Sequence, residues 1–273
     1  MPGRFEWPVR AASGFVLGAI MVLSLVFGGV VFSLVVSAAA IAALREWHRL
    51  INAGQLAFET IPTSMAMIAA SLYALPRARI DMALAAIVAG GVAAAVISAF
   101  RKRTTTWPIP WHAFGALYMG MTVLTLVLLR GQPHGALYIG ALFTAVWTAD
   151  TGALLAGRLL GGPKLAPWLS PNKTWAGFMG GAAAAGAAEA IFCLIFDGSV
   201  LGGIALGILL AVVGHAGDLF ESWVKRQFHA KNTGSLIPGH GGMLDRIDSL
   251  LFAAPVMAVL VLMGFSPFSE TPL

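Results

Sequence analysis

Charged residues are scarce in this chain. Asp, Glu, Lys and Arg make up 11% of its 273 residues, hydrophobic residues make up 58%, and the mean hydropathy is +0.83. A soluble domain carries about 25% charged residues, so this composition excludes an ordinary soluble fold. Cysteine is almost absent too: Cys193 is the only one, which excludes an internal disulfide. The low charge predicts a protein embedded in a membrane.

Long apolar runs take the place of the missing charge. Backbone groups in lipid must form hydrogen bonds within the protein, which leaves helices or a closed barrel. Unbroken runs of about 16 to 22 residues favour helices, because barrel strands alternate every second residue. We therefore predict an all-α, polytopic membrane bundle of about nine transmembrane helices, expected at residues 11–27, 30–45, 60–76, 80–100, 112–129, 136–157, 175–196, 200–217 and 248–265. Residues 1–273 would form a single membrane domain, with a scaffold over 1–140 and the site over 141–265.

The distribution of positive charge predicts the orientation of this bundle. With nine spans, fourteen of the 17 Lys and Arg residues fall on the side of the N-terminus and three on the other side. The positive-inside rule then places the N-terminus and the most charged connection in the cytoplasm of a bacterial-type inner or plasma membrane. The pI of about 9.8 reflects this topology and attraction to anionic lipid, and it does not indicate nucleic-acid binding.

The most polar stretch of the chain is residues 217–249. A helix from about 201 to 226 would place four polar side chains on one face: Asp218, Glu221, Ser222 and Lys225. A second helix from about 244 would do the same for Asp245, Asp248 and Ser249. Facing carboxylates suit Mg²⁺, and Lys, Arg and the exposed N–H groups of a glycine turn suit phosphates. The alternative is a solvated, salt-bridged loop between membrane helices.

A second polar stretch covers residues 147–177. Asp150 lies within an apolar span, where an ionisable residue is costly and is by default a functional candidate; a structural pair with Arg158, about two turns later, is the alternative. Ser170 or Thr174 is placed to cap the next helix, whose N–H groups and positive dipole end would favour a phosphate. A cap with no ligand explains these two residues equally well.

Both stretches resemble the phosphatidate cytidylyltransferases, also called CDP-diacylglycerol synthases. The first matches through Asp150-Thr151-Gly152-Ala153, Gly157-Arg158, Leu165-Ala166-Pro167 and Ser170-Pro171-Asn172-Lys173-Thr174-Trp175-Ala176-Gly177. The second matches through Ser222, Lys225-Arg226, Lys231, Pro238, His240-Gly241-Gly242, Asp245-Arg246 and Asp248. Asn232 departs from the family's Asp, and Asn172 and Ala176 replace a common Lys and Glu. The motif match covers about residues 147–249, and the first 140 residues resemble the family only in hydropathy and span count.

The resemblance implies a nucleotidyltransferase that converts phosphatidic acid and CTP to CDP-diacylglycerol and pyrophosphate, with Mg²⁺ and with K⁺ as an ion that could share the site. Asp218 and Asp245 would be metal ligands, with Glu221 and Asp248 as alternate ligands. The catalytic set would be Asp218, Ser222, Lys225, Asp245, Arg246 and Asp248. The residues expected to bind substrate or phosphate are Asp150, Arg158, Ser170, Lys173, Thr174, Lys225, Arg226, Lys231, His240, Gly241, Gly242 and Arg246. Its partners would be CTP, phosphatidic acid and membrane lipid, without nucleic acid; the sequence leaves a homodimer open.

Two other functions stay open at this point. A membrane kinase that uses CTP to phosphorylate a polyprenol would share a site for metal and nucleotide. A transporter would explain two acidic residues within apolar spans, Asp150 and Glu189. Transporters of this kind carry inverted repeats with paired broken helices, and the sequence shows no such repeat.

Overall fold

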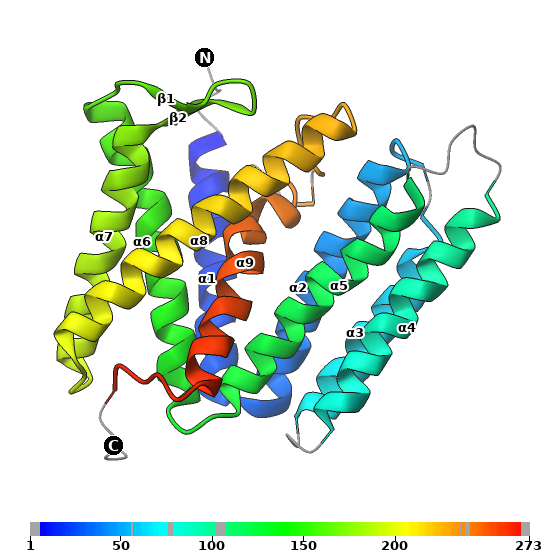
Figure 1. Cartoon of the computed structure of the whole chain (residues 1–273), viewed down its shortest axis with the longest axis horizontal. Coiled ribbons are helices and arrows are strands. Elements are labelled where there is room, and N and C mark those ends of the chain that lie inside the picture. The colour runs from blue at the N-terminus through cyan, green and yellow to red at the C-terminus, as the bar shows by residue number, and fades with distance from the viewer. Residues whose placement is uncertain are drawn as a thin grey trace. The chain divides into compact units, whose positions relative to one another are not determined.

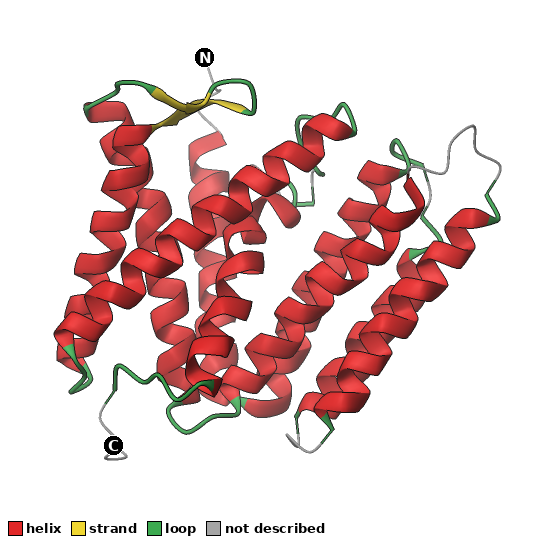
Figure 2. Cartoon of the chain, viewed as in Figure 1, coloured by secondary structure: helices red, strands yellow, loops and turns green. Residues whose placement is uncertain are grey.

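The computed structural model describes residues 6–55, 57–75, 79–101, 108–234, 236–237 and 241–268. In that part of the chain it contains nine helices and one small two-stranded sheet (Figures 1 and 2). The elements are α1 (Glu6–Phe27), α2 (Gly29–Ile51), α3 (Thr60–Ala74), α4 (Ile80–Ala99), α5 (Pro108–Arg130), α6 (Gly135–Leu159), β1 (Lys164–Ala166), β2 (Ser170–Thr174), α7 (Trp175–Ile195), α8 (Val200–Gln227) and α9 (Leu244–Leu262). The predicted all-α, polytopic class is confirmed.

Six of the described helices are long and apolar enough to cross a membrane by length and composition: α2, α4, α5, α6, α7 and α8. Three helices fall outside this set. The apolar part of α1 is shorter, at Ala12–Phe27, α3 has 15 residues, and α9 begins with a charged turn. The apolar runs predicted most helix ends closely, and α8 continues beyond the apolar run to Gln227, close to the end near residue 226 that the polar spacing indicated. This extension carries the polar face that the sequence predicted.

The chain divides into two compact units. Unit 1 consists of Met1–Gly131 with Gln227–Ile247, and unit 2 consists of Gln132–Arg226 with Asp248–Leu273. The boundary at residues 131 and 132 follows α5. The segment Gln227–Ile247, which contains much of the polar stretch, belongs to unit 1 with the N-terminal helices.

Unit 1 is built from α1 to α5, with α5 packed against α2, α3 and α4. Small residues let these helices approach closely: a Cβ atom at Gly91 would lie 3.2 Å from the carbonyl oxygen of Ala113. The first two helices are separated at Gly28, whose φ of +63° favours glycine. Arg130 secures this break, since its Nη2 donates to the carbonyl oxygen of Leu25 at 3.0 Å. The first two apolar runs are therefore two distinct helices.

In unit 2, α6, α7 and α8 pack closely where glycines face the backbone of a neighbouring helix. A Cβ atom at Gly181 would lie 2.7 Å from the carbonyl oxygen of Ala149 on α6, and one at Gly203 would lie 2.5 Å from the carbonyl oxygen of Glu189 on α7. At Gly217, it would lie 2.6 Å from the carbonyl oxygen of Asp248. This backbone approach at Gly217 brings the polar part of α8 against the start of α9.

A short antiparallel hairpin, β1–β2, joins α6 to α7, with Lys164 opposite Thr174 and Ala166 opposite Ser170. The sequence predicts no strands here, since the segment contains two prolines and shows no alternation of apolar and polar residues. Thr174 is the N-cap of α7: its Oγ1 accepts a hydrogen bond from the amide of Gly177 at 3.1 Å. Of the two candidate caps, Ser170 instead lies within β2.

Candidate functional site

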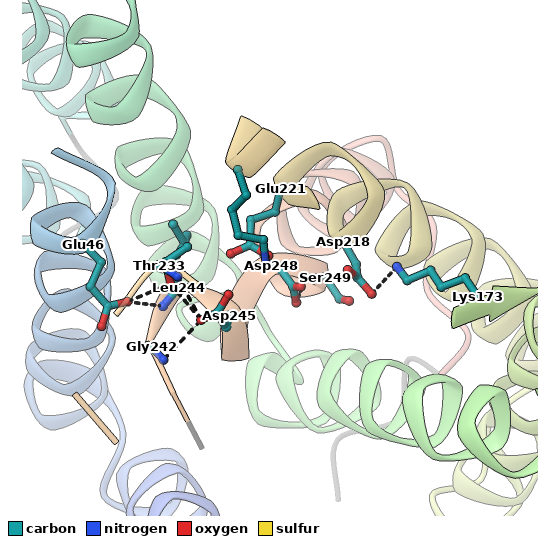
Figure 3. A network of polar contacts seen from close by, with 11 residues as sticks. Glu46, Lys173, Asp218, Glu221, Thr233, Gly242, Leu244, Asp245, Asp248 and Ser249 are labelled. Atoms are coloured by element: carbon teal, nitrogen blue, oxygen red, sulfur yellow. Dashed lines mark hydrogen bonds and ion pairs between the residues drawn. The ribbon is translucent and has the colours of Figure 1, made fainter. Parts of the chain in front are cut away.

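Three carboxylates meet in unit 2. Asp218 and Glu221 lie one helical turn apart on α8, and Asp248 lies near the start of α9 (Figure 3). One oxygen from each carboxylate can be chosen so that all three lie within 4.8 Å of one another. The helical spacing of Asp218 and Glu221 and the close backbone approach at Gly217 explain why residues 27 or more positions apart in sequence converge.

Two lysines neutralise part of this negative charge. Lys173, at the end of β2, forms an ion pair with Asp218 (Figure 3). Lys225 is four residues after Glu221 on α8, and its Nζ lies 2.9 Å from Glu221 Oε2. The Glu221 side chain is only 1% exposed, so its charge requires such a partner. The predicted polar face of α8 is thus a paired and partly buried cluster, which differs from a solvated loop.

The three carboxylates fit a divalent metal ion. Two like charges about 4 Å apart repel each other by roughly 4 kcal/mol at an effective dielectric constant of about 20, and three such charges outnumber the two lysine ammonium groups. The group contains only oxygen donors, which are the ligands of hard ions such as Mg²⁺. The Asp248 carboxylate is already oriented, because its Oδ1 accepts a hydrogen bond from the amide of Ser249 at 2.7 Å.

Several other predicted site residues of unit 2 have exposed side chains. Asp150 is exposed on α6, and its charge is close enough to act on the Asp248 carboxylate. Arg158 is exposed near the end of the same helix, and Arg226 is exposed near the end of α8. Ser222, next to Glu221 on α8, is partly buried. The arginines are therefore accessible cations, as phosphate-binding groups must be.

The remaining predicted site residues lie in unit 1, where Asp245 organises its own segment. Its Oδ2 accepts three hydrogen bonds: from Thr233 Oγ1 at 2.9 Å, from the Thr233 amide at 3.3 Å and from the Gly242 amide at 3.2 Å (Figure 3). Sequence reasoning had grouped Asp245 with Asp218 as a metal ligand. In the structure this oxygen holds the turn that precedes α9.

The other predicted site residues near Asp245 are a glycine in a left-handed conformation and several exposed polar side chains. Gly241 has a φ of +86°, and it exchanges two backbone hydrogen bonds with Ile237, at 2.9 and 3.1 Å. Lys231 and Arg246 are exposed, as is Asn232. His240, which the sequence also placed among the phosphate-binding candidates, lies outside the described residues.

Sequence reasoning missed one residue of this network. Glu46, on α2, is 6% exposed, and its Oε2 accepts a hydrogen bond from the amide of Leu244 at 2.9 Å (Figure 3). The available signal was a lone carboxylate among the basic residues at the end of α2, Arg45, His48 and Arg49. It did not reveal a partner 198 positions away.

Comparison with known proteins extends the similarity to most of the chain. The sequence pattern of the Cytidylyltransferase family matches residues 8–263. The chain belongs to this family. A phosphatidate cytidylyltransferase of Brucella suis biovar 1 (strain 1330) is 42% identical over 258 residues, which cover 93% of this chain and 92% of the relative. The phosphatidate cytidylyltransferase of Staphylococcus saprophyticus (strain ATCC 15305) is 31% identical over 261 residues, which cover 93% and 98%.

The match confirms the family that the motifs of residues 147–249 indicated, and it extends the relationship to the N-terminal helices. The motif residues of this cytidylyltransferase family member fall in both units. Unit 2 supplies the three-carboxylate cluster, and unit 1 supplies the segment around Asp245.

Proposed function

We propose that this member of the Cytidylyltransferase family transfers the cytidylyl group of CTP to phosphatidic acid, giving CDP-diacylglycerol and pyrophosphate. The observation that carries the proposal is the similarity, over 93% of the chain, to proteins named phosphatidate cytidylyltransferase. The oxygen-only carboxylate cluster of unit 2, with lysines beside it, is the arrangement that handling of a metal-bound triphosphate requires.

The reaction exchanges one phosphorus–oxygen bond for another. A phosphate oxygen of phosphatidic acid attacks the α-phosphorus of CTP and forms the new bond. The bond from the α-phosphorus to the oxygen bridging to the β-phosphate breaks, and its electron pair leaves with pyrophosphate. A phosphate monoester with a second pKa near 6 is largely ionised at neutral pH, so the attacking oxygen needs no strong general base. Catalysis is then mainly positioning and charge stabilisation.

The residues of unit 2 supply the charge stabilisation. Asp218, Glu221 and Asp248 would hold Mg²⁺, which when bound neutralises negative charge on the triphosphate. Lys173 and Lys225 now pair with two of these carboxylates, and they would contact phosphate oxygens beside them. Each lysine stays oriented by its carboxylate while it attracts the nucleotide, which reduces the reorganisation needed during the reaction.

Further cations would bind the outer phosphates and the lipid. In unit 2 these are the exposed Arg158 and Arg226. The exposed Lys231 and Arg246 of unit 1 are proposed as phosphate-binding residues on the family resemblance. K⁺ is a second ion that we propose for the site, on the family resemblance alone. The excess of Lys and Arg on the N-terminal side of the predicted spans supports a cytoplasmic site, where CTP is available and the lipid enters from the inner leaflet.

Radiolabel transfer by the purified protein tests this function. CTP labelled at the α-phosphate or at the γ-phosphate is supplied with Mg²⁺ and phosphatidic acid in detergent micelles, and a parallel reaction omits phosphatidic acid. We expect the α-label in the lipid product and the γ-label in pyrophosphate, only when phosphatidic acid is present. Transfer of the γ-label to lipid would indicate a lipid kinase instead. No label in any lipid would contradict the proposal.

A further inference from the structure

Glu46 is a buried carboxylate of unit 1 that the proposed reaction does not use directly. It lies on α2, in the N-terminal part of the chain that the sequence predicted to be a scaffold. Its polar partners are Thr233, between α8 and α9, and Leu244, the first residue of α9. We call the described residues 228–234, 236–237 and 241–246 the connecting segment. Both partners belong to unit 1, as Glu46 does.

One hydrogen bond defines the contact between Glu46 and this segment. The amide of Leu244, the first residue of α9, donates to Glu46 Oε2 at 2.9 Å, and the Leu244 side chain is completely buried. The first amides of a helix have no partner within the helix, and its N-terminus attracts negative charge. A remote carboxylate therefore satisfies the start of α9.

Thr233 joins Glu46 to Asp245. Its hydroxyl lies 2.9 Å from Asp245 Oδ2 and 3.4 Å from Glu46 Oε2. A hydroxyl has a single proton to donate, and the shorter distance assigns it to Asp245. Glu46 therefore holds the segment chiefly through the Leu244 amide, while Thr233 packs between the two carboxylates.

Two glycines allow the connecting segment to approach Glu46 this closely. A Cβ atom at Gly242 would lie 2.6 Å from Glu46 Oε2 and 3.0 Å from Asp245 Oδ2. A Cβ atom at Gly234 would overlap Glu46 Oε1. The backbone at Gly234 and at Gly242 is thus fitted to this one carboxylate.

The part of α2 that carries Glu46 is itself firmly held. Trp47 is completely buried, and its Nε1 donates to the carbonyl oxygen of Trp111 at 2.9 Å. The Nδ1 atoms of His48 and His112 lie 2.7 Å apart, which ties α2 to α5 a second time. A carboxylate on such a support can set the position of the connecting segment, whose described residues before α9 form no helix and no named strand.

We propose that Glu46 is a positioning residue for nucleotide binding. By fixing Leu244 and the turn before it, Glu46 holds the connecting segment so that Lys231 and Arg246 present their charges to the phosphates of the nucleotide. Both side chains are exposed, so packing alone does not fix them. The inference rests on the proposed function for the identity of the ligand. That Glu46 fixes the connecting segment follows from the Glu46–Leu244 contact alone.

Three variants of the full-length protein test this role. Glu46→Ala removes the acceptor, whereas Glu46→Gln keeps one carbonyl oxygen for the Leu244 amide. Glu59→Gln is the matched control, since Glu59 is a second buried carboxylate of unit 1, and its described partners are Asn52, Arg101 and His112. Backbone hydrogen exchange over residues 230–247 is measured first, without substrate, and CTP kinetics follow.

We expect faster exchange in that peptide for Glu46→Ala and near wild-type exchange for Glu46→Gln and Glu59→Gln. We also expect the KM for CTP to rise by about 10- to 100-fold in Glu46→Ala, because small misplacements of binding groups cost up to about 10²-fold, with substantial recovery in Glu46→Gln. A merely structural role would lower the apparent kcat, through loss of folded protein, and leave KM unchanged.

Unchanged exchange over residues 230–247 in Glu46→Ala would overturn the inference, even if the protein proved to have another activity. Faster exchange with an unchanged KM for CTP in an active enzyme would also overturn it, because the segment would then not act on the nucleotide. Failure of the proposed function is seen separately, as absence of label transfer by the wild-type protein. In that case, exchange decides whether Glu46 fixes the segment.

Discussion

Replacing Asp218 by asparagine tests whether the unit 2 cluster holds the metal. The side chain keeps its size and one carbonyl oxygen, but it loses the charge that faces Glu221 and Asp248. A unit-charge interaction at about 4 Å contributes roughly 4 kcal/mol at an effective dielectric constant of about 20. Removal of one preorganised electrostatic group from a site typically lowers kcat by about 10²- to 10³-fold. We therefore expect Asp218→Asn to lower kcat by at least about 10²-fold.

The dependence on Mg²⁺ concentration is the sharper readout. Initial rates at saturating CTP and phosphatidic acid should reach half of their maximum at a higher Mg²⁺ concentration in the variant. Asp218 also pairs with Lys173, so the Tm of the variant changes both through the lost ion pair and through the lost metal contact. The rise of Tm on addition of Mg²⁺ isolates the metal contribution: an ion present at 100 times its Kd stabilises the folded state by about 2.7 kcal/mol, and this stabilisation should shrink in the variant.

Asp197→Asn is the matched control. Asp197 is an exposed aspartate of unit 2 in the connection between α7 and α8, with a φ of +51° that asparagine tolerates well. It should leave the rate, the Mg²⁺ midpoint and the Mg²⁺-dependent rise of Tm unchanged. An Asp218→Asn rate within about threefold of wild type, with the same Mg²⁺ midpoint, would refute the assignment, because loss of one ligand charge is expected to cost far more.

Three further outcomes follow from the structure. Chelation with EDTA should stop turnover and Mg²⁺ should restore it, with Zn²⁺ a poor substitute for an all-oxygen site; full activity after exhaustive chelation would exclude a metal role. Thr174→Ala should lower the free energy of unfolding by about 1 kcal/mol and Thr174→Ser should retain it, and identical thermal unfolding of both variants would contradict the cap. Asn232→Asp should change kcat by no more than severalfold, because an added exposed ion pair contributes under about 1 kcal/mol, and a change above tenfold would show a direct role.

The helices were predictable because a membrane-spanning helix requires a continuous apolar run of about 20 residues, which is visible in the local sequence. Apolar runs near 20 residues predicted the spans. The spacing of Asp218, Glu221 and Lys225 correctly predicted a shared polar face on α8. The β1–β2 hairpin was missed, since neither strand is long enough to show an alternating pattern.

Long-range partners were not predictable in the same way. The sequence could not assign different surroundings to Asp245 and Asp248, which lie three residues apart at the start of α9. Asp245 binds Thr233 and the turn, whereas Asp248 joins the carboxylate cluster. Glu46 reaches its partner across 198 positions, and periodicity carries no information over such a separation. These contacts depend on tertiary packing, which local patterns do not encode.

Metal-directed backbone cleavage tests most directly whether the three carboxylates form the metal site. Fe²⁺ binds oxygen ligands and, with ascorbate and oxygen, produces radicals that cut the backbone close to the bound ion. We predict cleavage of the full-length protein near residues 218–221 and near residue 248, suppressed by excess Mg²⁺ and lost in Asp218→Asn. Cleavage confined to other positions, or cleavage that Mg²⁺ does not suppress, would contradict the assignment of Asp218, Glu221 and Asp248 as the metal ligands.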